Sequence, residues 1–166
     1  MNRRDILLTS AISAIGLTLP VRGLAQTNLA KAKIVGAWSL VSIYDEGADG
    51  RKYDVWGEGV QGFVVFTAGG HFSSQIVAAG RDKTVAKNPR MPVGQMIGYF
   101  GTYEVDDEKM TNTLHFERCT FPAWDGVVRV SKITAIDDVE YRNESQLVHD
   151  PVNGDVVPKA VWKRTT

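Results

Sequence analysis

The chain has 166 residues and a formal net charge of zero, with 19 Lys or Arg against 19 Asp or Glu. This length suits one domain with one hydrophobic core. Because the sequence contains no basic block, we expect no binding to nucleic acid or to an anionic membrane surface. The single cysteine, Cys119, excludes an internal disulfide and a thiolate metal cluster.

The N-terminus has the order of features found in a secretory signal. Arg3-Arg4 precede a weakly apolar run at 6–19, and a small-residue cleavage site ends at Ala25. The paired arginines resemble the twin-arginine pattern. The apolar run is shorter than the roughly 20 residues that a membrane-spanning helix needs. We therefore expect a cleaved signal peptide at 1–25, a periplasmic or secreted location, and no stable membrane insertion of the mature chain.

The rest of the chain has the spacing of turn residues that is typical of an all-β protein. After a lead-in at 26–33, β-branched and aromatic runs alternate with turns rich in Gly, Pro, Asp and Asn. Strong turn signals include Ala68-Gly69-Gly70 and Asn153-Gly154. Eight strands are predicted, at 34–44, 62–67, 71–78, 97–105, 110–121, 127–136, 145–149 and 156–163.

Eight short strands with hairpin-length connections favour one antiparallel up-and-down barrel over residues 34–166. Closure of the barrel removes the exposed edges that an open sheet would leave. A sandwich is the alternative fold, but no turn calls for the long crossovers of a Greek key. A barrel of eight strands either fills its interior with side chains or holds one small ligand.

Several motifs resemble the bacterial lipocalin-like domain family. Gly36-Ala37-Trp38 is similar to the Gly-x-Trp opening of lipocalin-type barrels, and the similarity extends through nearly all of residues 34–164. Four further segments carry it, at 62–73, 99–105, 121–126 and 161–164. The chain departs from the pattern before the second strand, where Val60 stands near the place of an expected proline. The resemblance implies a barrel with a cavity, but it does not imply one activity.

The same resemblance assigns a structural role to Trp38. In lipocalin-type barrels a Trp of the first strand plugs the closed end, and a late basic residue packs across its ring. Arg164 is the candidate for that partner, with Trp162 as the alternative. These residues are therefore expected to build the architecture and not a binding site.

An acid–base site is one interpretation of the strand at 110–121. His115 and Glu117 share one face of this strand, while Leu114 and Phe116 share the other. If the polar face lines the lumen, Glu117 would orient the imidazole, and Arg129 of the next strand would neutralise the carboxylate or hold an anion. In the alternative, the apolar face lies in the core and His115 and Glu117 face solvent.

Further residues are candidates for contact with a ligand. Tyr99 and Tyr103 share a face on either side of Gly101, which leaves space for a ligand or a neighbouring ring. Trp124 follows Pro122 at a corner and is expected at the barrel rim. His71 and Gln75 share the polar face of another strand, although most such faces are solvated.

Two hypotheses from different classes follow. The first is a barrel that binds one small hydrophobic or amphipathic molecule in its central cavity. The second is a cofactor-independent isomerase, cyclase or lyase that uses acid–base residues in the same cavity. The three histidines show no metal-ligand spacing, and neither a phosphate-binding loop nor a Gly-x-Ser-x-Gly elbow is present, so we expect no metal or cofactor. The ligand, the reaction and the oligomeric state stay open at this point.

Overall fold

The structure, a computed structural model, describes residues 29–85, 88, 90–91 and 93–165. The predicted signal peptide at 1–25 lies outside the described residues. No helix among the residues described is long and apolar enough to cross a membrane.

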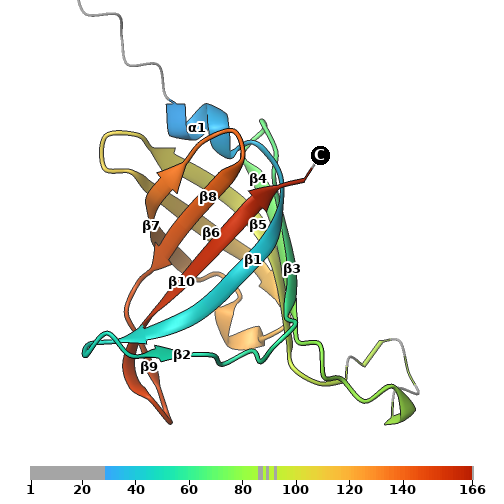
Figure 1. The fold of residues 1–166 in the computed structure, drawn as a ribbon. Coiled ribbons are helices and arrows are strands. Elements are labelled where there is room, and N and C mark those ends of the chain that lie inside the picture. Colours follow the sequence, from blue (N-terminus) through green and yellow to red (C-terminus); the bar gives the residue numbers. More distant parts are fainter. Residues whose placement is uncertain (1–28, 86–87, 89, 92, 166) are drawn as a thin grey trace, which may run out of the picture.

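The chain forms an all-β, closed antiparallel barrel, as predicted (Figure 1). Eight strands close the barrel through pairing of β1 with β10, and the short β2 and β9 extend one end. The strands are β1 (Gly36–Gly47), β2 (Lys52–Tyr53), β3 (Gln61–Phe66), β4 (His71–Val77), β5 (Met96–Asp106), β6 (Thr111–Cys119), β7 (Val128–Ile136), β8 (Glu140–Ser145), β9 (Val148–Asp150) and β10 (Gly154–Arg164). The helices are α1 (Leu29–Ile34) and the 3₁₀ turns η1 (Lys83–Val85) and η2 (Pro122–Trp124).

One predicted strand is misplaced. The run at 145–149 was expected to be the seventh strand, but β8 occupies Glu140–Ser145 and β9 follows at Val148–Asp150. The sequence of β8 is polar, so it lacks the β-branched signal of a strand. The Asp137 carboxylate accepts bonds from the amides of Val139 and Glu140, both at 2.7 Å, which makes the turn tight and starts β8 early.

Bulges decide which side chains of two strands face inward. In β1 the pairing with β10 skips Val41, so Trp38 faces the interior before the bulge and Asp45 after it. In β6 the pairing with β5 skips Glu117. Strict alternation along each strand therefore fails beyond these points, since each bulge adds one residue to one side only.

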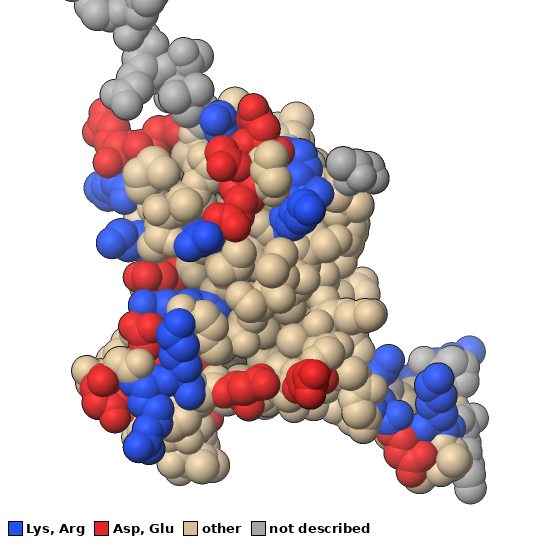
Figure 2. Space-filling model, in the orientation of Figure 1, with Lys and Arg blue, Asp and Glu red and all other residues tan. Residues whose placement is uncertain are grey.

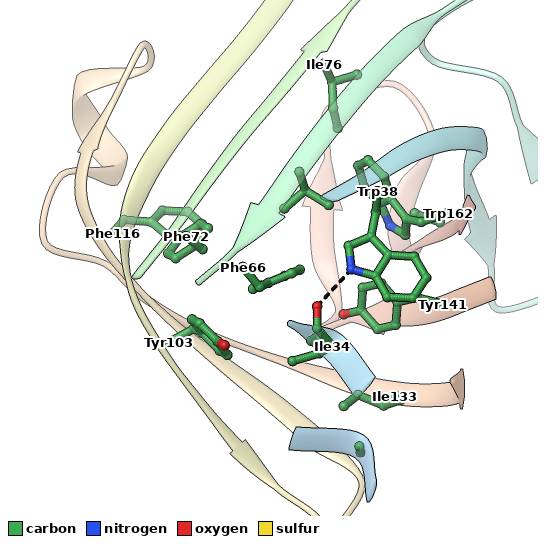
Figure 3. Close-up of a cluster of buried hydrophobic side chains, with 13 residues drawn as sticks. Ile34, Trp38, Phe66, Phe72, Ile76, Tyr103, Phe116, Ile133, Tyr141 and Trp162 are labelled. Atoms are coloured by element: carbon green, nitrogen blue, oxygen red, sulfur yellow. Dashed lines mark hydrogen bonds between the residues drawn. The ribbon is translucent and has the colours of Figure 1, made fainter. Parts of the chain in front are cut away.

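The α1 end of the barrel is filled by a compact aromatic core (Figure 3). Trp38 is fully buried, and its indole Nε1 donates to the carbonyl of Ile34 at 2.8 Å. Tyr141 lies tilted against the Trp38 ring with centroids 5.8 Å apart. The Asp107 carboxylate accepts bonds from the first amides of α1, which holds this helix over the barrel end.

Arg164, one of the two candidates given by the lipocalin resemblance, is the residue that covers the plug. Its Cζ lies 4.1 Å from the centroid of the Trp38 ring. The guanidinium donates to three backbone carbonyls, those of Lys33, Val35 and Asp138. Stacking and the three hydrogen bonds together hold the guanidinium across the Trp38 ring at the closed end. Trp162 instead lies inside the barrel, where its Nε1 donates to Asn143 at 2.9 Å.

The outer wall over β1 and β3 carries few charged side chains (Figure 2). Val41 and Phe63 are exposed there. Scattered exposed apolar residues are normal on a protein surface, so this wall by itself indicates no site.

Candidate ligand-binding site

A cavity of about 460 Å³ opens at the end of the barrel opposite α1. This volume lies within the range of about 300–1,000 Å³ that small-molecule sites occupy. Its walls are mainly apolar and come from strands all around the barrel. The apolar lining includes Ile43, Trp56, Ile76, Ile97, Leu114 and Phe116.

Aromatic rings form a continuous row along one wall of this cavity. Tyr99 stacks on Phe116 with centroids 4.6 Å apart, and Phe116 lies tilted against Trp124 at 6.0 Å. Trp124 belongs to η2, between β6 and β7, and is half-buried at the edge of the cavity. The row makes this wall of the cavity aromatic, which suits a ligand that contains an aromatic ring.

The floor of the cavity is polar. Ser131 and Asn143 border both the cavity and a smaller hollow of about 40 Å³ beneath it. Ser74 and Asn112 line this hollow, and both residues are almost completely buried. Within the described part of the chain, Ser74 Oγ and Asn112 Oδ1 have no hydrogen-bond partner. Buried polar atoms are rarely left unpaired, so these two are available to bind a polar ligand group or an ordered water in the hollow.

Tyr99 joins the aromatic wall to this polar floor. Burial raises the pKa of the Tyr99 phenol above its ordinary value, and the nearby Ser74 hydroxyl and Arg129 guanidinium offset part of the rise. The Ser74 hydroxyl does not, however, reach hydrogen-bonding geometry with any described group. Tyr99 therefore stays a neutral phenol at ordinary pH and can donate or accept one hydrogen bond.

Arg129 lies in the cavity wall, stacked on Trp124. Its Cζ is 3.9 Å from the centroid of the Trp124 ring, and the side chain is half-buried. Burial lowers the pKa of the guanidinium, which nevertheless stays charged. Ser131 and Ile133 on the same face of β7 are buried, whereas Val128 is exposed. The usual pattern is thus inverted near this end of β7, with polar side chains inside and an apolar one outside.

The opposite part of the rim is acidic. Asp45 lines the cavity from β1 and is 9% exposed. Burial raises the pKa of its carboxyl, and the negative charge of Asp150 raises it further. In the strand order, β10 and β8 separate β1 from β7, which places Asp45 away from Arg129 around the barrel.

The predicted cluster of His115, Glu117 and Arg129 does not form inside the barrel. Leu114 and Phe116 line the cavity, so His115 lies on the outer face of β6 and Glu117 is exposed in the bulge. The interpretation that placed both in the lumen is wrong, because the larger apolar side chains take the interior. Of the three residues, Arg129 alone lines the cavity.

The bulge also explains Gly101. A Cβ at this position would collide with the carbonyl oxygen of His115 and lie 2.9 Å from the amide of Glu117. The expected space between Tyr99 and Tyr103 is therefore occupied by the β6 backbone and not by a ligand. Glycine is needed here for close approach of two strands.

The other predicted ligand contacts divide between the cavity and elsewhere. Tyr99 and Trp124 line the cavity. Tyr103 faces inward but belongs to the closed end, where its hydroxyl donates to the Thr67 carbonyl at 2.8 Å. His71 and Gln75 are exposed on the outer face of β4, because Phe72, Ser74 and Ile76 take the inner face. A ligand in the cavity would not reach these three predicted residues.

Sequence reasoning missed several polar residues of the cavity and of the hollow beneath it, among them Asp45, Ser74, Asn112 and Asn143. Ser74, Asn112 and Asn143 each lie on the inward face of a strand beside large apolar residues, and that position was the available signal. Asp45 carried no such signal, because only the bulge at Val41 turns it inward. Among the residues described, no three His, Cys, Asp or Glu side chains converge as metal ligands would.

Comparison with known proteins identifies the family. The sequence profile of the lipocalin-like domain matches residues 35–165. The chain belongs to the lipocalin-like domain family. A search among curated proteins found no significant match. Among solved structures, this lipocalin-like domain is similar to a redesigned β-barrel at 11% identity, with a TM-score of 0.42 over 83% of this chain and 96% of that one.

Proposed function

We propose that this lipocalin-like domain is an exported carrier or sensor that binds one small, largely apolar molecule in its central cavity. The observation that carries the proposal is the cavity of about 460 Å³, which has aliphatic and aromatic walls and a small polar floor. Apolar walls supply affinity, and a few convergent polar groups orient the ligand. Export rests on the signal features at 1–25.

Binding can be tested with a neutral fluorescent probe. N-phenyl-1-naphthylamine, whose emission rises in apolar surroundings, is expected to bind the purified chain with one site per molecule. Ile97→Trp should abolish this signal, because Ile97 lines the cavity and an added indole would fill the space between its walls. Val41→Trp adds the same ring to an exposed position on the outside of β1 and should leave binding unchanged. Equal binding by both variants would refute a site in the cavity.

Export has its own test. The chain with Arg3→Lys and Arg4→Lys should stay in the cytoplasm. The unaltered chain should appear in the periplasm or medium, and its intact mass should be that of a chain whose first residue is Gln26. Unchanged export of the variant would argue against the twin-arginine route, and an uncleaved product would argue against the signal peptide.

A second function, catalysis without a cofactor, is supported by one observation. Asp45 is a buried carboxyl with a raised pKa in the cavity wall, as a general acid or base requires. The two functions differ in the fate of the bound molecule. A carrier releases its ligand unchanged, whereas an enzyme converts it, and mass spectrometry of molecules extracted before and after incubation distinguishes them.

A further inference from the structure

The cavity contains an arginine that lacks an anionic partner. Arg129 forms no ion pair and donates no hydrogen bond to any residue that the structure describes, although its guanidinium is half-buried. Arg164 provides a comparison within the same barrel, since it stacks on Trp38 in the same way but donates to three carbonyls. The two arginines therefore share the stacked position and differ in what satisfies their donors.

An unpaired charge that is half-buried has lost part of its hydration, so its retention in a cavity calls for a physical reason. Removing a guanidinium from water costs free energy that stacking on Trp124 returns only in part. Stacking also holds the planar group in one orientation and leaves its N–H edges free. Such a fixed fork matches the two oxygens of a carboxylate.

Neighbouring groups make this part of the wall suitable for an anion. The Tyr99 phenol lies close enough to Arg129 for the two to influence each other's pKa. A neutral phenol can donate a further hydrogen bond to an acidic oxygen. Asp45 and Asp150 line the cavity from β1 and β9, so their charges disfavour an anion on that part of the wall.

We propose that the ligand is a small organic acid with a planar apolar body, and that Arg129 is the residue that binds its acid group. The inference rests on the proposed function, because it requires that the cavity be a binding site. The body of the ligand would lie along Phe116 and Trp124. Its acid group would contact the free edge of the Arg129 guanidinium, with Tyr99 as a second donor.

Two probes with the same ring system separate the anion site from the cavity itself. 8-Anilinonaphthalene-1-sulfonate is the acidic counterpart of N-phenyl-1-naphthylamine, and its sulfonate stands in for a carboxylate. In Arg129→Gln, the affinity of the purified chain for the acidic probe should fall by about 10- to 100-fold, as expected for loss of charge-assisted hydrogen bonds. The affinity for the neutral probe should change by less than about twofold.

Two control variants are needed. One tests whether the planar shape of the Arg129 side chain matters in addition to its charge, and the other tests whether loss of any one positive charge has the same effect. Arg129→Lys keeps the charge but loses the planar fork, so it should bind the acidic probe with intermediate affinity. Arg142→Gln removes an exposed arginine of β8 that pairs with Glu140, and it should bind both probes as the unaltered chain does. If Arg129→Gln lowers the affinity for both probes equally, or for neither, the anion site is refuted, but the proposal of a binding cavity is not. If neither probe binds the unaltered chain, the proposed function and this inference both fail.

Discussion

The two ends of the barrel use the same pair of side chains for different purposes. At the closed end, Trp38 is buried, and Arg164 stacks on its ring and donates to three backbone carbonyls. At the open end, Arg129 stacks on Trp124 beside a cavity and has no such acceptors among the described residues. The comparison teaches that an arginine–tryptophan stack is architectural when backbone carbonyls accept from the guanidinium. Where the described residues supply no such acceptor, the donors are left for a ligand, as we propose for Arg129.

The largest effect is expected at the plug of the closed end. Trp38→Ala should lower the free energy of unfolding by about 3–5 kcal/mol, because a fully buried large ring is lost and a void remains. Trp124→Ala should cost much less, since this ring is half-buried at the cavity rim. Urea denaturation of both variants provides the measurement. A cost below about 1 kcal/mol for Trp38→Ala would mean that this ring does not hold the fold together.

The two arginines test the comparison directly. Arg164→Gln should destabilise the protein by about 2–4 kcal/mol, because several charge-assisted hydrogen bonds to carbonyls are lost. Arg129→Gln should change stability by no more than about 0.5 kcal/mol, because relief of an unpaired charge offsets the lost stacking. Equal losses in thermal or urea unfolding would show that both arginines are structural.

A smaller effect of opposite sign is expected at the cavity floor. Ser74→Ala should raise stability by about 1 kcal/mol, because it removes a buried hydroxyl that has no described partner. Ser73→Ala, its exposed neighbour on β4, serves as the control and should be neutral. A loss of stability in Ser74→Ala alone would indicate that the hydroxyl is satisfied, for example by an ordered water.

The smallest effect depends on pH. Because burial raises the pKa of Asp45 in the folded state, folding disfavours its ionised form, and stability should fall as pH rises through that pKa. Asp45→Asn should therefore be more stable than the unaltered chain at pH 7. The difference should shrink as pH falls through the raised pKa of the folded state, and it should be lost below about 3.9, the ordinary value for Asp. Asp155→Asn, at an exposed site, is the control. A difference that is independent of pH would contradict this origin.

Much of the fold was predictable because local patterns carry it. Turn residues and β-branched runs located seven of the eight barrel strands, and the resemblance to lipocalin-type barrels assigned Trp38 to the closed end. The polar strand β8 was missed, since its stability comes from cross-strand partners such as the Trp162–Asn143 hydrogen bond. Such partners can be identified only when it is known which distant segments of the chain pair as strands.

The candidate site was predictable only in part. Alternation correctly grouped His115 away from Leu114 and Phe116, but the pattern alone does not say which group faces the interior. Closure of the barrel decides this, because the interior takes the side chains that lose most by contact with water. The sequence offers both Arg129 and Trp124 as candidates, yet their stacking depends on how η2 packs against β6 and brings Trp124 to Arg129.

The sequence by itself therefore determined an all-β barrel, its Trp38 plug and the residues that share a strand face. Tertiary structure decided the orientation of those faces and the contents of the cavity. The physical reason is that side-chain alternation is a local property of an extended strand, whereas a bulge or a missing partner is a relation between strands. The bulge at Val41 turns Asp45 inward, and the absence of a described acceptor distinguishes Arg129 from Arg164.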